Sequence, residues 1–459
     1  MDMDEKNEPT ERPLVSIIVP IYNTEEYLEE CLDCLVNQTL QNIEIICIND
    51  ATEDNSMEIV QKFAKNSNKI KIIENEVNKG LSATRNIGIG SVNGEYISFF
   101  DSDDIIEKTA FEKLYNEAKE HDQDVIVYNI KRFNDEGEEW FEILQKKSNI
   151  SEYAEKTDLL KNSELIYSTT SCNKFIKTDY LKRIDHKFIE NILFEDIPFT
   201  TKLLLNTDSI GIYPDVIYYW RVRDKSITQT NSNVKNLNDR VFVSKYILNY
   251  VDEEADEKYK PLKKTIYKKL LEHDFSLFIN ELDVGDEEFK ETLISEIVPL
   301  IKTFPKESFD DIGELEKAKY NLLIKEDIEN IIHIVKYEKT NKEITNAKIK
   351  QKNAEIKQLR IRKEEIRARK EEIRARKEEI RKEKNEIIRQ KNAEIKQLRI
   401  RKEEIRARKE EIRKEKNETI RELRERNKKQ REEIKELKST KGWMKYKTAN
   451  LYERGKNKL

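Results

Sequence analysis

The sequence predicts an α/β fold with a mostly parallel sheet, followed by an α-helical domain and a long charged helix. Between Leu14 and about Ile130, short β-branched runs alternate with helical patterns, which is typical of βαβ units. Residues 236–339 place apolar side chains at helical spacing, and residues 341–440 contain neither proline nor glycine. A proline-free and glycine-free stretch of this length favours one near-continuous helix.

The individual elements follow from local pattern. We expect strands at Val15–Tyr22, Ile43–Asp50, Ile70–Ile73, Glu95–Asp101, Ser209–Tyr213 and Val216–Trp220. We expect helices at Glu25–Asn37, Asn55–Asn66, Leu81–Ile89, Thr109–Lys119 and Phe199–Leu205. The chain then divides into an acidic flexible tail (1–11), the α/β domain (12–235), a helical domain (236–340), a charged repeat helix or coiled coil (341–440) and a basic aromatic tail (441–459).

Charge is distributed very unevenly along the chain. The 459 residues carry 86 Lys and Arg against 91 Asp and Glu, a formal charge of −5. Residues 1–340 carry a net −25, whereas residues 341–459 carry a net +20. An acidic globular part therefore carries a basic extension, and an asymmetry of this size is typical of an interaction tail.

Composition excludes several classes of protein. No apolar run approaches the roughly 18 residues that a membrane-spanning helix needs. The first eleven residues are acidic and polar, unlike a secretory signal peptide. The four cysteines all precede residue 173 and are too few for a disulfide scaffold, so we expect a reducing, cytoplasmic location.

Polar residues follow the predicted strands at the points where each strand ends. They are Tyr22-Asn23, Asn49-Asp50 and Asp101 to Asp104. Because ligands of open α/β sheets bind beyond the carboxyl ends of the strands, this coincidence predicts the active site. Asp101 and Asp103 can both reach one hard cation such as Mg²⁺ or Mn²⁺, with phosphate and water supplying further ligands. The alternative is that these acids cap the helix at Thr109–Lys119.

Other candidate residues also have structural alternatives. Asp50 can be a turn residue after its strand, Arg85 a solvated helix charge, and Glu195-Asp196 a helix N-cap. Cys31-x-x-Cys34 has the spacing of a redox or zinc motif, but no second Cys/His pair lies at metal-binding spacing. The buried face of a helix is the better interpretation of this pair.

Five segments in one order carry a family resemblance. They are VSIIVPIYN (Val15–Asn23), INDATEDNS (Ile48–Ser56), KGLSATRN (Lys79–Asn86), GEYISFFDSDD (Gly94–Asp104) and LFEDIP (Leu193–Pro198). Together they resemble glycosyltransferase family 2 over residues 12–235. The resemblance implies the GT-A fold, a Rossmann-like catalytic domain, and transfer of a sugar from a nucleotide-diphosphate donor with inversion.

The resemblance also implies roles for individual residues. Pro20, Tyr22, Asp50, Lys79, Arg85, Asn86 and Asp101 match positions that bind or border the nucleotide, and Asp101 and Asp103 match the metal-binding pair. Asp196, preceded by Glu195, matches the general base, while Arg221 and Arg223 resemble a segment near the active site. Where the family pattern reads Asp-Asp-Gly-Ser-Thr-Asp, this chain has Asn49 to Asp54 and keeps the acid Asp50.

These residue types suit an inverting transfer. A carboxylate can accept the proton of the attacking hydroxyl, and a divalent cation, Mn²⁺ or Mg²⁺, can offset the charge of the departing diphosphate. The expected donor is a UDP-sugar, and the expected acceptor is a surface glycan or a lipid-linked acceptor. Two alternatives stay open: a non-catalytic nucleotide-sugar-binding scaffold or coiled-coil interaction protein, and a sugar nucleotidyltransferase.

The basic extension contains an internal repeat. The segment NAEIKQLRIRKEEIRARKEEIR begins at Asn353 and again at Asn392, and apolar residues recur every seven positions from Leu359 to Ile387. This period favours a left-handed coiled coil and a homo-oligomer. A solitary helix stabilised by Glu-to-Arg pairs such as Glu365–Arg369 is the alternative.

The last segment, 441–459, places Trp443, Met444 and Tyr446 among six Lys and Arg. Aromatic residues among basic ones suit an anionic membrane surface, so we expect peripheral contact with the inner face of the cell membrane. A capping or disordered end is the alternative. Acids interleaved through 341–440 argue against a nucleic-acid partner.

Overall fold

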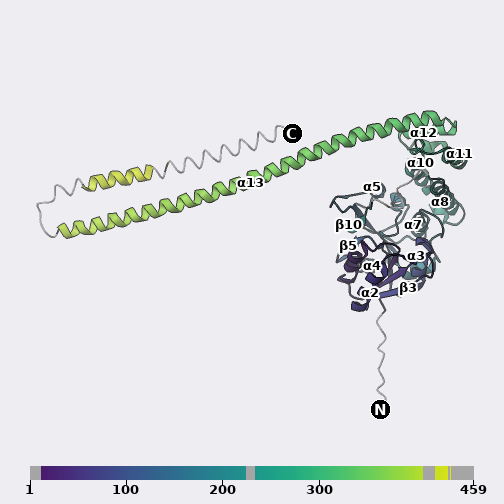
Figure 1. Cartoon of the computed structure of the whole chain (residues 1–459), viewed down its shortest axis with the longest axis horizontal. Coiled ribbons are helices and arrows are strands. Elements are labelled where there is room, and N and C mark those ends of the chain that lie inside the picture. Colours follow the sequence, from purple (N-terminus) through teal and green to yellow (C-terminus); the bar gives the residue numbers. More distant parts are fainter. Residues whose placement is uncertain (1–11, 224–232, 407–418, 433–434, 436–459) are drawn as a thin grey trace, which may run out of the picture. The chain divides into compact units, whose positions relative to one another are not determined.

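The computed structural model describes residues 12–223, 233–406, 419–432 and 435 (Figure 1). The predicted acidic tail 1–11 and basic aromatic tail 441–459 lie outside the described residues, as does part of the repeat helix. The chain forms two compact units, one up to Glu343 and one from Ile344. In the described part of the chain, no helix is both long enough and apolar enough to cross a membrane.

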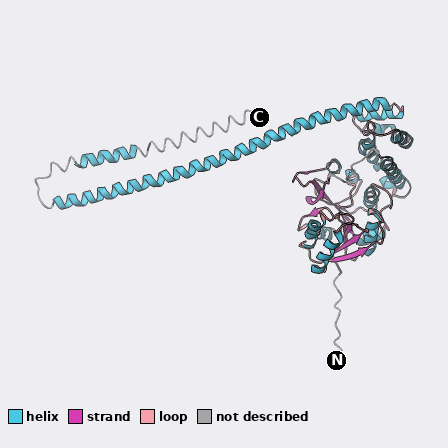
Figure 2. Cartoon of the chain, in the orientation of Figure 1, coloured by secondary structure: helices cyan, strands magenta, loops and turns pink. Residues whose placement is uncertain are grey.

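The first unit is built on a mixed sheet, whose strands are magenta in Figure 2. Its strand order is β3-β2-β1-β4-β9-β6-β10-β5, with β7 paired to β6 and β8 paired to β10. The strands are β1 (Val15–Ile21), β2 (Ile43–Asn49), β3 (Ile70–Glu74), β4 (Tyr96–Phe99), β5 (Ile105–Ile106), β6 (Val125–Phe133), β7 (Glu139–Trp140), β8 (Ala154–Thr157), β9 (Lys174–Lys177) and β10 (Ile210–Arg221). The longest ladders, β1–β2 and β6–β10, are parallel, which confirms the predicted fold class.

Helices cover both faces of this sheet. They are α1 (Leu28–Val36), α2 (Ser56–Asn66), α3 (Leu81–Ser91), α4 (Ala110–Glu120), α5 (Ile143–Lys147), α6 (Thr178–Arg183) and α7 (Asp196–Leu205), with a 3₁₀ turn at Ser163–Tyr167. Successive residues of β1 point to opposite faces, so Ile17 packs with α1 and α4 while Ile18 packs with α3 and α7. Gly88 lets α3 approach β1 closely, since a Cβ there would lie 2.4 Å from Cγ2 of Ile18.

Sequence and structure differ at several boundaries. The two strands expected at Ser209–Tyr213 and Val216–Trp220 form one strand, β10, whose register with β6 shifts between Tyr213 and Tyr218. Strands β6 and β9 were not expected, and β9 runs antiparallel to both β4 and β6. The helix expected from Glu25 begins at Leu28, after a turn in which the Thr24 carbonyl accepts hydrogen bonds from Tyr27 N and Leu28 N.

The region after β10 is helical, as predicted, and continues the core of the α3/α7 face. Its helices are α8 (Val234–Glu253), α9 (Lys263–Lys269), α10 (Ser276–Ile279), α11 (Glu287–Ile301), α12 (Glu314–Ile324) and α13 (Ile328–Arg406), with short turns at Glu257–Leu262, Leu270–Asp274 and Lys306–Phe309. Buried side chains from α8 to the start of α13 belong to the same apolar cluster as Ile18 and Phe199. The domain boundary after residue 235 stays a prediction.

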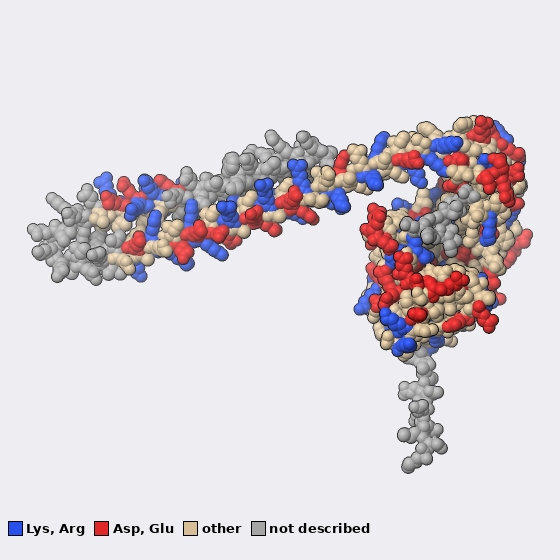
Figure 3. Space-filling view, in the orientation of Figure 1, with Lys and Arg blue, Asp and Glu red and all other residues tan. Residues whose placement is uncertain are grey.

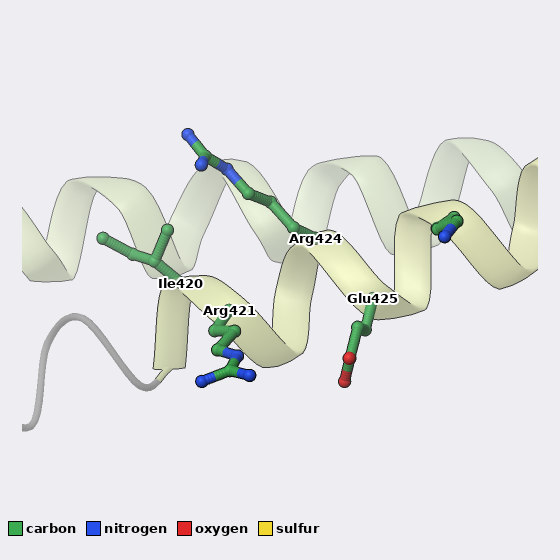
Figure 4. Close-up of a pocket in the computed structure, with 5 residues that line it drawn as sticks. Ile420, Arg421, Arg424 and Glu425 are labelled. Atoms are coloured by element: carbon green, nitrogen blue, oxygen red, sulfur yellow. The ribbon is translucent and has the colours of Figure 1, made fainter.

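Among the described residues, the second unit contains the rest of α13 and the helix at 419–432. Leu359, Ile366, Ile373, Ile380 and Ile387 are each 43–57% exposed. Figure 3 shows basic and acidic side chains interleaved along the described part of α13. A hollow on the 419–432 helix is lined by Ile420, Arg421, Arg424, Glu425 and Lys428 of that one helix, and Arg421 and Glu425 point the same way (Figure 4). Four of these five side chains are charged and all come from one helix, so the hollow is an open groove on its surface. The self-association of α13 stays a prediction.

Candidate active site

The side chain of Arg85 connects three of the predicted site segments. Arg85 lies on α3 and is only 2% exposed. Its Nη2 donates to Asp101 Oδ1 at 2.9 Å, and its Nη1 lies 2.9 Å from both Glu195 Oε1 and Asp196 Oδ1. The alternative of a solvated helix charge at Arg85 is therefore wrong. The fold brings the end of β4 and the start of α7 to one buried cation.

The acidic pair at the start of α7 is electrostatically asymmetric. Burial, together with the charge of Asp196, raises the pKa of Glu195 to about 7, although Arg85 opposes this shift. Burial lowers the pKa of the Arg85 guanidinium, but Asp196 and Asp101 outweigh it and hold that pKa well above its usual range. The side chain of Asp196 is 23% exposed against 13% for Glu195. Asp196 is thus the more accessible carboxylate, and neither acid makes a side-chain cap bond to α7.

The turn after β4 is held by β10. Asp104 is 1% exposed, and its carboxylate accepts hydrogen bonds from Tyr218 Oη at 2.5 Å and from Arg221 N at 2.7 Å. The Arg221 Nε donates to the carbonyl of Asp103 at 2.9 Å. The N-cap residue of α4 is Thr109, and the carboxylates of Asp101, Asp103 and Asp104 contact Arg85, Arg223 and β10, so the alternative that these acids cap α4 is wrong. These contacts fix the conformation in which Asp101 and Asp103 are presented.

The two acids at the predicted metal site fit a hard cation. Burial and the nearby charge of Asp101 raise the pKa of Asp103 to about 6, and Arg223 Nη2 lies 2.7 Å from its Oδ2. A divalent cation would relieve this crowding of negative charge, and carboxylate oxygens are its preferred ligands. Within the described residues, no group of three or more His, Cys, Asp or Glu could hold a metal ion. The remaining ligands would therefore come from water and phosphate oxygens.

The ends of β1 and β2 form the neighbouring edge of the site. Pro20 is buried and pairs with Ile48, whereas Tyr22 is 45% exposed just beyond the strand. Asn23 and Ala51 follow the two strands with φ of 52° and 56°, a left-handed conformation that residues other than glycine adopt at a cost. The exposed ring of Tyr22 lies beside the turn at Asn23 and can stack on a planar base.

Asp50 is bonded to the loop that leads into α3. Its Oδ1 accepts hydrogen bonds from Asn75 Nδ2 at 2.9 Å and Lys79 N at 2.8 Å, and its Oδ2 accepts one from Gly80 N at 2.9 Å. Gly80 has a φ of 83°, which a glycine adopts without strain. Asp50 is 4% exposed, and these bonds hold the loop that carries the exposed Lys79.

Asn86 supports the segment that leads to the acidic pair. Its amide exchanges two hydrogen bonds with the backbone of Phe188, at 2.9 and 3.0 Å. The Phe188 ring stacks on Phe199 of α7 with ring centroids 3.9 Å apart, and His186 stacks on the same ring at 4.7 Å. These contacts hold the segment that leads to α7, and the expected position of Asn86 beside the nucleotide stays a prediction.

Three site residues escaped the sequence analysis. Tyr218 is the Asp104 partner named above, Cys172 Sγ lies 3.3 Å from Asp101 Oδ2, and Lys174 is fully buried. The Nζ of Lys174 donates to the carbonyls of Ser168 and Thr170, and burial lowers its pKa to about 7. The available signal was a lysine directly before the apolar pair Phe175-Ile176 of β9. Cys31 and Cys34 are free thiols on α1, and Cys31 is buried, as the helix-face interpretation predicted.

Comparison with known proteins places the chain among glycosyltransferases. The sequence model of glycosyl transferase family 2 matches residues 16–185. The chain is 33% identical to the uncharacterized glycosyltransferase EpsJ of Bacillus subtilis over 47% of this chain and 63% of EpsJ. It is 32% identical to glycosyltransferase GlyG of Streptococcus pneumoniae over 50% of this chain and 78% of GlyG. The match thus spans less than two thirds of EpsJ but most of GlyG.

A solved structure shares the fold. Residues 1–349 of Staphylococcus aureus TarS, crystallised with UDP, match with a TM-score of 0.57 and 25% identity, over 71% of this chain and 91% of that one. Full-length TarS, a poly(ribitol-phosphate) beta-N-acetylglucosaminyltransferase, is 33% identical over 45% of this chain and 35% of its own length. The TarS match therefore supports the predicted fold class.

Protonation of His186 is expected to weaken the support around α7 at low pH. Its Nε2–H donates to the Phe199 carbonyl at 2.9 Å, and burial lowers its pKa to about 4. In the unfolded chain the same histidine is protonated near pH 6.5. Its contribution to the free energy of unfolding is therefore complete above that pH and is lost as the pH falls towards 4. Between pH 7 and pH 5 the loss is about 2 kcal/mol.

Urea unfolding at both pH values measures this effect. His186→Gln keeps a hydrogen-bond donor but does not titrate, so its free energy of unfolding should fall by about 2 kcal/mol less than that of the parent. His333→Gln removes an exposed histidine and should behave as the parent does. Equal losses in the parent and His186→Gln would contradict the assignment.

Proposed function

The chain belongs to glycosyltransferase family 2, and on this premise we propose that it transfers a sugar from a nucleotide-diphosphate sugar, a UDP-sugar, to a hydroxyl of a surface glycan or lipid-linked acceptor. The single observation that carries the proposal is the Arg85 cluster, which unites Asp101 with Glu195 and Asp196. The UDP bound by TarS supports the donor class. The acceptor class is suggested by relatives that act on poly(ribitol-phosphate).

Asp196 is proposed as the general base. Its Oδ1 lies 2.9 Å from Arg85 Nη1, and its partial exposure leaves an oxygen accessible to an acceptor hydroxyl. Asp196 takes the hydroxyl proton as the acceptor oxygen forms its bond to C1 of the sugar. The bond from C1 to the diphosphate breaks on the opposite side, so the anomeric configuration inverts. Glu195, with its raised pKa, shares the Arg85 charge and helps to fix this geometry.

The donor is proposed to bind along the carboxyl ends of β1, β2 and β4. Tyr22 and Pro20 would contact the base, with Asp50 supporting that edge, and the exposed Lys79 would approach the diphosphate. Asp101 and Asp103 would hold the Mg²⁺ or Mn²⁺, which supplies Lewis-acid stabilisation of the leaving diphosphate. Arg223, paired with Asp103, adds positive charge at the same place.

Removing the base should abolish turnover while leaving donor binding intact. With UDP-, GDP- and TDP-sugars, Mn²⁺ and an acceptor lipid or glycan, Asp196→Asn should lower the rate of nucleoside diphosphate release by about 10²–10⁴-fold. Its dissociation constant for UDP should stay within about twofold of the parent value. Asp179→Asn, at a side chain that is 73% exposed, is the matched control and should match the parent.

Two results would contradict the proposal. Turnover by Asp196→Asn at the parent rate would remove the assigned base. If no donor is turned over, and Asp103→Ala binds nucleotide as tightly as the parent, the non-catalytic scaffold becomes the better interpretation.

A homo-oligomer through the 341–440 helix is a second part of the proposal. Half-exposed apolar residues recur every seven positions on α13, and burying this line against a second copy would remove it from water. The intervening basic residues restrict the seam to one apolar layer per heptad, which favours a weak association.

Sedimentation equilibrium of the full chain tests this association. The parent should form a reversible oligomer at micromolar concentration, and the double variant Ile366→Gln/Ile373→Gln should raise the dissociation constant at least about tenfold. Ile361→Gln changes an isoleucine of similar exposure, 52%, that lies off the seven-residue line, and it should leave the constant nearly unchanged. A monomeric parent at about 100 μM would refute the coiled coil.

The basic tail 441–459 is proposed to contact the anionic inner face of the cell membrane, because it combines aromatic residues with six Lys and Arg. Co-sedimentation with vesicles of phosphatidylglycerol and phosphatidylcholine should capture the parent more strongly than a chain that lacks residues 441–459. The difference should shrink as salt is raised, since basic residues bind anionic headgroups electrostatically. Equal capture of both chains would remove the membrane role.

A further inference from the structure

The segment that carries the acidic pair has a strained backbone. Phe194, directly before Glu195, has a φ of 65°, in the left-handed region that a bulky side chain rarely adopts. Its carbonyl accepts the hydrogen bond from Ile197 N at 3.0 Å that opens α7. Such a conformation persists only when its surroundings stabilise it, at a cost of about 1–3 kcal/mol. The contacts that hold Phe194 therefore determine where Glu195 and Asp196 point.

Two consecutive residues of α8 make those contacts. The Oδ2 of Asp239 accepts a hydrogen bond from the backbone N–H of Leu193 at 3.0 Å. The guanidinium carbon of Arg240 lies 3.7 Å from the centroid of the Phe194 ring, which is close for a cation–π contact. One residue fixes the backbone before the strained position, and the next fixes the strained side chain itself.

Arg240 is in turn held by a buried charge cluster. It is 5% exposed, and its Nη1 lies 3.4 Å from Oδ1 of Asp274, which is 1% exposed. The other Asp274 oxygen accepts a hydrogen bond from Lys269 Nζ at 2.6 Å, and His273 Nδ1 lies 3.0 Å from Oδ1. Burying these charges is expensive and often less stabilising than an apolar core would be. Stability alone therefore does not explain this cluster, whereas a role in holding the Arg240 side chain does.

Helix α8 also holds the far end of α7. Asn206, which follows α7, donates from Nδ2 to Tyr250 Oη at 2.8 Å. The Nζ of Lys202 lies 5.1 Å from the centre of the same tyrosine ring. Both ends of the segment from Leu193 to Asn206 are thus fixed to one helix of the region that follows the sheet, and α7 and α8 lie close together in Figure 1.

We propose that Asp239 and Arg240 are positioning residues that hold Phe194 in its left-handed conformation and thereby aim Asp196 at the acceptor hydroxyl. The helical region is then part of the catalytic apparatus. This inference rests on the proposed function, in which Asp196 is the general base. If Phe194 relaxed to a negative φ, the chain direction after it would change, and Glu195 and Asp196 would lose their 2.9 Å contacts with Arg85.

Asp239 and Arg240 together form a clamp, which acts on the proposed base, Asp196, and not on the donor. The residues proposed to bind the donor lie at the ends of β1, β2 and β4, and Asp239 and Arg240 contact the segment 193–194 instead. A displacement of about 1 Å at a catalytic group can lower the rate by about 10²-fold without affecting binding elsewhere. Loosening the clamp is therefore expected to lower kcat and leave donor affinity unchanged.

The experiment compares four forms of the full chain. Asp239→Ala removes the acceptor for Leu193 N–H, and Asp239→Asn restores an acceptor oxygen. Lys245→Gln is a control on the same helix, α8, and breaks an exposed ion pair with Glu296 of α11. Each is measured for kcat, for the dissociation constant of UDP with Mn²⁺, and for amide hydrogen exchange of residues 193–197. Arg240→Gln is a second clamp variant, used if Asp239→Ala does not fold.

Asp239→Ala should lower kcat at least about tenfold, keep the UDP dissociation constant within about twofold, and speed exchange at 193–197 at least about tenfold. Asp239→Asn should recover most of both losses, and Lys245→Gln should match the parent. A clamp variant with the parent's kcat and exchange, or one whose UDP affinity falls in parallel with kcat, would overturn the inference.

Failure of the clamp is distinguishable from failure of the proposed function. A parent chain without turnover on any donor refutes the proposed function. In that case the exchange of residues 193–197 still tests the clamp. Faster exchange in Asp239→Ala, recovered in Asp239→Asn, supports the backbone role, and unchanged exchange refutes it.

Discussion

The geometry of the site depends on one buried guanidinium. Arg85 is almost completely removed from water, and its charge is compensated by carboxylates from the end of β4 and the start of α7. A buried cation costs several kcal/mol to desolvate unless opposite charges and hydrogen bonds surround it. The acids need the cation as well, because Asp101, Glu195 and Asp196 would repel one another at this distance without Arg85. The cation therefore fixes the distance between the proposed metal-binding acid and the proposed base.

The supports around this cluster share one form. A polar side chain on one element forms a hydrogen bond with the backbone of a neighbouring site loop. Asp50 bonds the loop at Lys79 and Gly80, Asn86 bonds Phe188, and Asp239 bonds Leu193. Such bonds fix the path of a loop without placing a side chain in the space that substrates need. They help to explain how Arg85 and Glu195, which are 110 residues apart in sequence, lie 2.9 Å apart.

Sequence alone predicted strands β1 to β4 and the acids that follow β2 and β4, because buried parallel strands have a strong apolar signal and their carboxyl ends meet at one edge. It identified Asp101, Asp103 and Glu195-Asp196 as a set only through the order of the motifs. It did not predict that Arg85 joins them, since that contact depends on tertiary packing of α3. Strand β9 was missed because it is four residues long and contains the buried Lys174. The place of Asp50 and Asn86 beside the nucleotide stays a prediction, and their hydrogen bonds to the backbone of Lys79, Gly80 and Phe188 depend on tertiary packing that no local pattern reveals.

The two halves of the chain use charge in opposite ways. In the first unit the important charges are buried, paired and few, and each one determines a position: Arg85 for the acids, Arg240 for Phe194, and Arg221 for the turn at Asp103. Along α13 the charges are exposed and repeated, so each pair contributes only about 0.2–0.5 kcal/mol and none fixes a geometry. A repeat of this kind tolerates changes of length and register far better than the cluster around Arg85 does. The precision of the chemistry therefore belongs to the first unit, and the extension is suited to weak contacts that are summed over a long surface.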